Sequence, residues 1–165
     1  MWPRLRLTNE EKAYVQKYAD PSKPGRGVLR RLYAGHLALT GAVRTPTFTF
    51  QISRRSRVFG LTFSGDVTRF RVEIITSSGE LHTPQPVYLP HLQPGFMQSE
   101  QGVAPGATPS WFSVLPYIFE PSLVLLPNQT LNLNGFPTDV FQDVDYRVDM
   151  ALHVWEFPGM LGSPY

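Results

Sequence analysis

The stretch that most constrains the fold of this chain runs from Asp143 to Phe157 and reads DVDYRVDMALHVWEF. Apolar and polar residues alternate along most of it, which is typical of a β-strand with one buried face. It contains neither Gly nor Pro, so nothing in it forces the strand to end. We expect a central strand of an antiparallel sheet. Its inward face should consist of Val144, Tyr146, Val148, Met150, Leu152 and Val154.

The opposite face of this strand changes character along its length. It begins with Asp143, Asp145, Arg147 and Asp149 and then becomes apolar. Alternate carboxylates could hold calcium or act as an acid–base pair, but we favour an exposed acidic face that meets water or a basic partner. The second half should be covered by an N-terminal arm, a C-terminal tail or another subunit. The candidate interface residues on this strand are Asp145, Asp149, Trp155 and Phe157.

The rest of the chain after residue 43 supports the same class of fold. Short apolar or alternating runs are separated by turns rich in Gly, Pro, Ser and Asn, and almost no helix is expected after residue 20. This pattern predicts an all-β, antiparallel, jelly-roll-like β-sandwich of about eight strands, with a small barrel as the alternative. The runs lie at 47–52, 58–63, 67–75, 81–89, 111–115, 117–119, 123–126 and 130–134, and prolines place 81–89 at an edge.

Residues 1–42 are predicted to form a basic, extended N-terminal arm. Thr8 and Glu11 have the spacing of a capping box, so a short helix should begin there and end before Pro21. The segment after the helix is either a solvated surface segment or an arm that lies on a neighbouring subunit or an anionic surface. Residues 43–157 would form the sandwich, and residues 158–165 an apolar C-terminal tail. The arm's candidate interface residues are Arg26, Arg30 and Arg31.

Several classes of function find no support in the composition. The chain has no Cys, which excludes disulfides, thiolate catalysis and cysteine-bound zinc. The histidines do not have metal-ligand spacing, and nucleophile-elbow, P-loop and dinucleotide-binding motifs are missing. No apolar run is long enough for a membrane helix, and charges replace the apolar core of a signal peptide. We therefore expect a protein that is not an enzyme, without cofactor or metal, and not bound to a membrane.

Charge is divided unevenly along the chain. Residues 1–71 hold 14 Lys and Arg against 4 Asp and Glu, whereas residues 72–165 hold 1 against 9. The basic half could bind nucleic acid, or one copy's basic segment could lie on another copy's acidic face. A basic cluster that includes Arg54 and Arg55 lies near Phe70, but Phe70 is out of phase with its neighbouring arginines. Nucleic acid is therefore possible but not favoured, and contact between copies is the preferred interpretation.

A long loop at residues 90–110 is the other candidate surface. Loops of this length inside a domain are usually functional or interfacial. Trp111 and Phe112 follow it and are candidate interface residues, with Tyr117 nearby. Aromatic rings of this kind could also stack on sugars, so a carbohydrate-binding module is an alternative.

The second half of the chain resembles small β-sandwich virion proteins of tailed bacteriophages. The resemblance rests on YIFEP at 117–121, LLPNQTL at 125–131 and the end of the long strand, LHVWEF at 152–157. It implies a structural protein located in the virion, either a capsid-associated decoration or minor capsid protein or a neck or tail adaptor. It also implies contacts with other virion proteins, such as the major capsid protein, and no catalytic residues. The uneven charge adds the expectation that the chain forms a homo-oligomer.

Overall fold

The structure is a computed structural model that describes residues 7–18, 29–76, 82–83, 85–92, 96–98, 111–113, 116–138 and 145–158. The side chains of residues 96–98, 111–113 and 120–121 are outside the description. In chain order, the helices and strands are α1 (Asn9–Tyr18), β1 (Leu29–Leu39), β2 (Thr47–Gln51), β3 (Ser56–Gly65), the 3-10 helix η1 (Val67–Arg69), β4 (Phe70–Thr76), β5 (Val87–Tyr88), α2 (Leu89–Leu92), β6 (Phe96–Gln98), β7 (Trp111–Ser113), β8 (Tyr117–Leu125), β9 (Thr130–Pro137) and β10 (Tyr146–Glu156).

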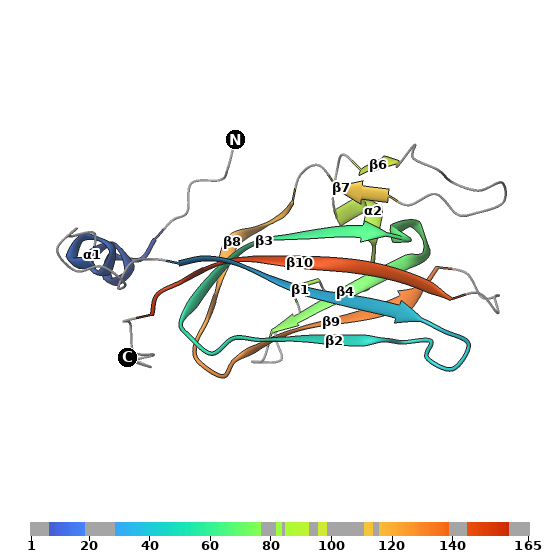
Figure 1. Ribbon diagram of the computed structural model, residues 1–165, viewed down its shortest axis with the longest axis horizontal. Helices are drawn as coiled ribbons and strands as arrows, with labels where there is room; N and C mark the ends of the chain where they lie inside the picture. Colours follow the sequence, from blue (N-terminus) through green and yellow to red (C-terminus); the bar gives the residue numbers. More distant parts are fainter. Residues whose placement is uncertain are drawn as a thin grey trace.

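Two antiparallel sheets face each other (Figure 1). Sheet A has the order β1-β10-β3-β7-β6, and β8 also pairs with β3. Sheet B has the order β2-β9-β4-β5. The predicted all-β sandwich is therefore confirmed, and the strand that dominated the sequence pattern, β10, lies inside sheet A with a partner on each side.

The chain passes between the two sheets in the order of a jelly roll. The strands β1, β3, β8 and β10 belong to sheet A, whereas β2, β4, β5 and β9 belong to sheet B. The order β1-β10-β3-β8 therefore faces the order β2-β9-β4-β5, which is the eight-strand arrangement of two interlocked Greek keys. The short strands β6 and β7 pair with each other and extend sheet A beyond this frame.

The core lies between the sheets and is built from alternate residues of each long strand. Full burial of one such side chain contributes about 1.5–3 kcal/mol. The predicted inward face of β10 is confirmed from Val148 to Val154, and Tyr146 is half-buried. The buried residues that these strands contribute include Phe50 from β2, Leu61 and Phe63 from β3, Phe70, Val72 and Ile74 from β4, and Leu131 and Leu133 from β9.

β1 occupies residues that the sequence analysis assigned to the arm. It pairs with β10 along its whole length, from Leu29 opposite Glu156 to Leu39 opposite Tyr146. Leu37 and Leu39 enter the core. At Gly35 an added Cβ would lie 2.3 Å from the ring of Phe48, so the missing side chain lets β2 of the other sheet approach. The arm before the sandwich therefore ends ahead of Leu29 and not at residue 42.

Three other expectations differ from the structure. Residues 67–69 form η1 instead of a strand, because the N–H of Arg69 turns back to donate to the carbonyl oxygen of Asp66 at 2.9 Å. Of residues 81–89, the described strand is only β5, which does lie at the edge of sheet B. β10 begins at Tyr146; Asp145 precedes it, and Asp143 and Val144 lie outside the described residues.

The helix α1 begins with the predicted capping box. The N–H of Thr8 donates to Oε2 of Glu11 at 2.9 Å, and the N–H of Glu11 donates to Oγ1 of Thr8 at 3.2 Å. These two bonds satisfy backbone donors that the first helical turn leaves without a partner. The helix lies at the end of the sandwich where β1 begins and β10 ends (Figure 1).

Candidate functional site

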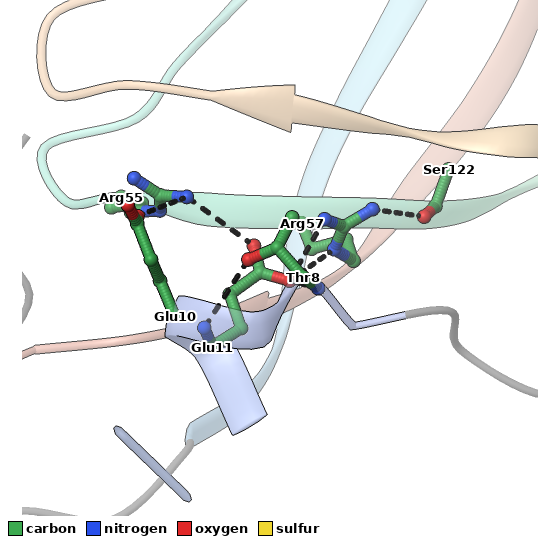
Figure 2. Close-up of polar contacts among 6 residues, drawn as sticks. All are labelled: Thr8, Glu10, Glu11, Arg55, Arg57 and Ser122. Carbon is green, nitrogen blue, oxygen red and sulfur yellow. Dashed lines mark hydrogen bonds and ion pairs between the residues drawn. The ribbon is translucent and has the colours of Figure 1, made fainter. Parts of the chain in front are cut away.

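A buried carboxylate attaches α1 to sheet A. The side chain of Glu11 is 0% exposed and faces two arginines of the β3 region. Arg57 donates from Nε to Oε2 at 3.0 Å, and its Nη2 lies 2.8 Å from the same oxygen. Nη2 of Arg55 lies 3.7 Å from Oε1 (Figure 2). Because Glu11 also caps the helix, one side chain both starts α1 and docks it.

Arg57 connects this helix to a second strand as well. Its Nη1 donates to Oγ of Ser122, on β8, at 2.7 Å (Figure 2). The guanidinium therefore joins α1, β3 and β8 through three of its nitrogens, which suits the fixed fork of an arginine better than a lysine. Removing one partner of a buried pair leaves an uncompensated charge and costs about 3–5 kcal/mol. These contacts therefore serve to fix α1 on sheet A.

An aromatic contact completes the docking of α1. The rings of Tyr14 and Phe157 meet edge to face with their centroids 5.8 Å apart. Both side chains are buried, and the N–H of Phe157 donates to the carbonyl oxygen of Arg55 at 3.0 Å. The apolar end of the long strand is thus covered by the helix of the same chain, which is one of the covers that the sequence analysis considered.

A second buried carboxylate lies at the same end of sheet A. Glu156 is 2% exposed and occupies the last inward position of β10, in phase with the core residues of that strand. The hydroxyl of Tyr33 donates to its Oε1, and Nε of Arg31 lies 2.8 Å from its Oε2. Burial, followed by the hydrogen bond to Glu156, raises the pKa of Tyr33 to about 12. This cluster ties β1 to β10.

The acidic outer face of β10 is exposed, and its charges are partly paired within the strand. Arg147 donates from Nε and Nη2 to Oδ1 of Asp149 at 2.9 and 2.8 Å. The two side chains are 61% and 54% exposed, so the pair contributes at most about 1 kcal/mol. Asp145 is exposed as well. A basic partner from another molecule could reach this face.

Farther along the same face, three rings form a row in which Phe59 is buried and His153 and Trp155 are half-buried. Phe59 of β3 lies 5.9 Å from His153 and 6.3 Å from Trp155 between ring centroids. Oγ1 of Thr62 is 3.4 Å from Nε2 of His153. Burial, and then the charge of Arg30, lowers the pKa of the His153 imidazole. Trp155 therefore packs on its own sheet while part of it faces solvent.

A third polar contact lies between the two sheets. His82 Nε2 and the hydroxyl of Tyr117 are 2.9 Å apart, and the His82 ring lies 4.8 Å from that of Phe119. Burial raises the pKa of Tyr117. The neighbouring Thr83 accepts a hydrogen bond from the N–H of Ile74 at 2.9 Å. Thr83 thus holds the segment after β4 against β4 itself, and His82 holds it against β8. Tyr117 remains half-buried.

The candidate residues from the sequence fall into different environments. Arg30 and Arg31 lie on β1, Arg54 is exposed in the bend before β3, and Arg55 binds the arm helix. Arg26 lies outside the described residues. Trp111 and Phe112 form part of β7 beside β3, and their side chains are outside the description. Among the described candidates, two groups form. Arg30 lies opposite Trp155 and the backbone of Arg55 bonds that of Phe157 at one end of sheet A, whereas Asp149, Trp111 and Phe112 lie near its other end.

The basic cluster proposed for nucleic acid is also divided. Phe70 is fully buried in the core, as its phase on the strand indicated. Arg55 and Arg57 face Glu11, and the guanidinium of Arg69 lies 5.3 Å from the centroid of the Tyr146 ring. Much of this positive charge therefore serves contacts within the chain.

Four residues of the two carboxylate clusters were not predicted from the sequence: Glu11 as a docking group, Arg57, Tyr33 and Glu156. A signal existed for Glu156, since it continues the buried period of two after Val154. A charged residue in a core phase predicts a buried partner. No signal marked Arg57 as the partner of Glu11, because that contact depends on how the chain folds back.

Within the described ranges, no group of three or more His, Cys, Asp or Glu residues could hold a metal ion. The described helices include none long and apolar enough to cross a membrane. Comparisons of the chain with protein-family models, with curated proteins and with solved structures find no match.

Proposed function

We propose that this chain is a non-enzymatic structural protein of a bacteriophage particle, associated with the capsid as a decoration or minor capsid protein. Contacts of the arm, the long loop and the tail with other subunits would hold it there. The observation that carries the proposal is the jelly-roll connectivity of the two sheets. Jelly rolls are a common architecture of viral capsid domains. The same fold also serves unrelated functions, so this support is an analogy at the level of fold.

The polar clusters agree with a structural role. Both buried carboxylates, Glu11 and Glu156, connect one element to another: α1 to β3, and β1 to β10. The charged partners, Arg57 for Glu11 and Arg31 for Glu156, each lie 2.8 Å from a carboxylate oxygen. Such clusters stiffen one end of a scaffold.

The carbohydrate-binding alternative has weaker support. Lectin domains share the jelly roll, and Tyr117 belonged to the aromatic group that motivated this hypothesis. Its hydroxyl is engaged with His82, and its ring lies 5.2 Å from that of Phe119. A sugar would need an open ring face, so this tyrosine is a poor platform.

Quantitative mass spectrometry of purified virus particles tests the proposal. The particles should come from the phage whose genome encodes the chain. The account predicts peptides of the chain at a fixed ratio to the major capsid protein. A small ratio would favour a neck or tail adaptor, since such positions occur few times per particle. Absence of the chain from intact particles, with the protein abundant in infected cells, would contradict the proposal.

A further inference from the structure

The edges of the two sheets differ in how well they are protected against pairing with another chain. An edge strand presents a row of unpaired backbone N–H and C=O groups, and proteins blunt such edges by making them short or by placing Pro, bulges or charges there. Here β5 has two residues, β6 has three and β2 has five. β8 is longer, but it contains Pro121, and its pairing with β3 is irregular.

β1 is the exception. It has eleven residues and contains no Pro, and its pairing with β10 has no register shift. In the described part of the chain no strand pairs with its other edge. The strand is also exposed on the outer face of sheet A at Arg30, Leu32, Ala34 and His36. Leu32 is 62% exposed, the most exposed of the large apolar side chains in the described residues.

We propose that β1 pairs antiparallel with β1 of a second copy, so that sheet A continues across a two-fold axis. This inference rests on the proposed assembly role and names the surface that carries it. In a two-fold interface both copies use the same surface. If residue i of the first copy contacts residue j of the second, residue j of the first also contacts residue i of the second. Edge-to-edge pairing supplies the main-chain hydrogen bonds that an exposed edge lacks.

The charges of β1 favour the antiparallel direction, and the second copy offers the same long, unprotected edge. Both arginines of the strand, Arg30 and Arg31, stand near its start, and no formally charged residue follows them in the strand. Full antiparallel overlap is centred on Ala34. Arg30 then lies opposite Ala38, and Leu32 lies opposite His36. Parallel pairing in register would place arginine beside arginine, which is destabilising.

The residue at the centre suits a close approach and gives a direct test. Ala34 would face Ala34 of the second copy, at about 4.5–5.5 Å between Cα atoms. That separation fits a disulfide, which needs about 4.4–6.8 Å. The chain has no native Cys, so Ala34→Cys creates a unique site. Val124→Cys is the matched control, because Val124 is 38% exposed on β8 and away from the edge of β1.

The experiment combines this cross-link with a charge test on the full chain. Under mild oxidation Ala34→Cys should give a disulfide-linked dimer, and Val124→Cys should stay unlinked. Ala34→Lys places like charges opposite each other and should weaken self-association by up to about fivefold, measured by light scattering during size exclusion. Val124→Lys should leave association unchanged. Thermal unfolding of each variant shows whether the fold is intact, since both substituted positions are exposed.

Three outcomes decide between the claims. Selective cross-linking of Ala34→Cys together with weaker association of Ala34→Lys supports the β1 interface. A wild-type chain that associates, with no selective cross-link and no effect of Ala34→Lys, overturns the β1 interface but leaves the proposed function standing. A wild-type chain that stays monomeric at every concentration overturns the β1 interface and removes the self-assembly on which the proposed function relies.

Discussion

At the scale of single residues, the end of the sandwich where α1 docks depends on two buried carboxylates. Glu11 and Glu156 are nearly inaccessible, and each faces at least one arginine. Burial of a charge is tolerated only when it is paired and hydrogen-bonded. These residues should therefore be much more sensitive to substitution than the exposed acidic residues of β10.

Arg57→Met should release α1 from the sandwich. The substitution keeps much of the apolar bulk but leaves the Glu11 carboxylate without its closest partner, while Arg55 remains at 3.7 Å. We expect the free energy of unfolding to fall by up to about 3–5 kcal/mol, limited by the docking energy of the helix, because undocking rehydrates the carboxylate. Urea unfolding measures the loss, and amide hydrogen exchange over α1 reports the undocking.

Two variants control this prediction. Arg147→Met removes an exposed ion pair and should cost less than about 1 kcal/mol. The double variant Glu11→Met with Arg57→Met removes both charges and should recover part of the loss, because a buried pair can be replaced by apolar residues. Equal effects of Arg57→Met and Arg147→Met would show that Glu11 is not docked as described.

Tyr33 should make stability fall in alkaline solution. Its pKa is raised from 10.0 to about 12 in the folded chain, so folding favours the protonated phenol. The resulting stabilisation is complete below pH 10 and is lost as the pH rises toward 12. In Tyr33→Phe the free energy of unfolding should decline less steeply over this interval. The slope should not vanish, since burial also raises the pKa of Tyr117. Urea unfolding at a series of pH values checks this, and an unchanged slope would refute the assignment.

At the scale of elements, the features that depend on neighbouring residues in the sequence were predicted correctly. The alternation of β10, the capping box of α1 and the inward phase of β4 are all found in the structure. β1 was missed because Arg30 and Arg31 made its first half look like a solvated arm. Its inward residues alternate only weakly, with Gly35 among them. Its partner is the strand farthest away in sequence, and a pairing of that kind has no local signature.

The candidate site could likewise be predicted only where it depends on residues close together in the sequence. Exposed charges such as Asp145 and Asp149 could be assigned to a surface from their phase on the strand. Arg55 and Arg57 looked like part of a basic surface patch, yet both face Glu11. Whether a charge is free or paired depends on tertiary contacts between α1 and β3, which lie well apart along the chain.

Two truncations separate the arm from the sandwich. Deletion of residues 1–18 removes α1 and Glu11 together, so Arg55 and Arg57 become hydrated and the sheets should stay folded with reduced stability. Deletion of residues 1–31 also removes Leu29, Arg30 and Arg31 from β1 and leaves Glu156 without its arginine. We expect the second deletion to be far more damaging. Near-ultraviolet circular dichroism and urea unfolding compare the two, and equal stability would contradict the place of β1 in sheet A.

At the scale of the whole molecule, the uneven charge along the chain is only partly balanced inside the fold. Arg31 of the basic half meets Glu156 of the acidic half, whereas Arg55 and Arg57 meet Glu11 of their own half. The outer face of sheet A still carries exposed charges and an exposed apolar residue, Leu32. A jelly roll by itself does not define a function, so the account rests on surfaces that join copies.

The most direct test of this account is sedimentation velocity of the intact wild-type chain over a wide range of concentrations. The account predicts a species of at least two copies that grows with concentration. Weak dependence on salt would fit an interface made mainly by backbone pairing, because salt screens exposed charges far more than hydrogen bonds. A single monomeric species at every concentration would contradict the claim that this protein works by assembling with itself.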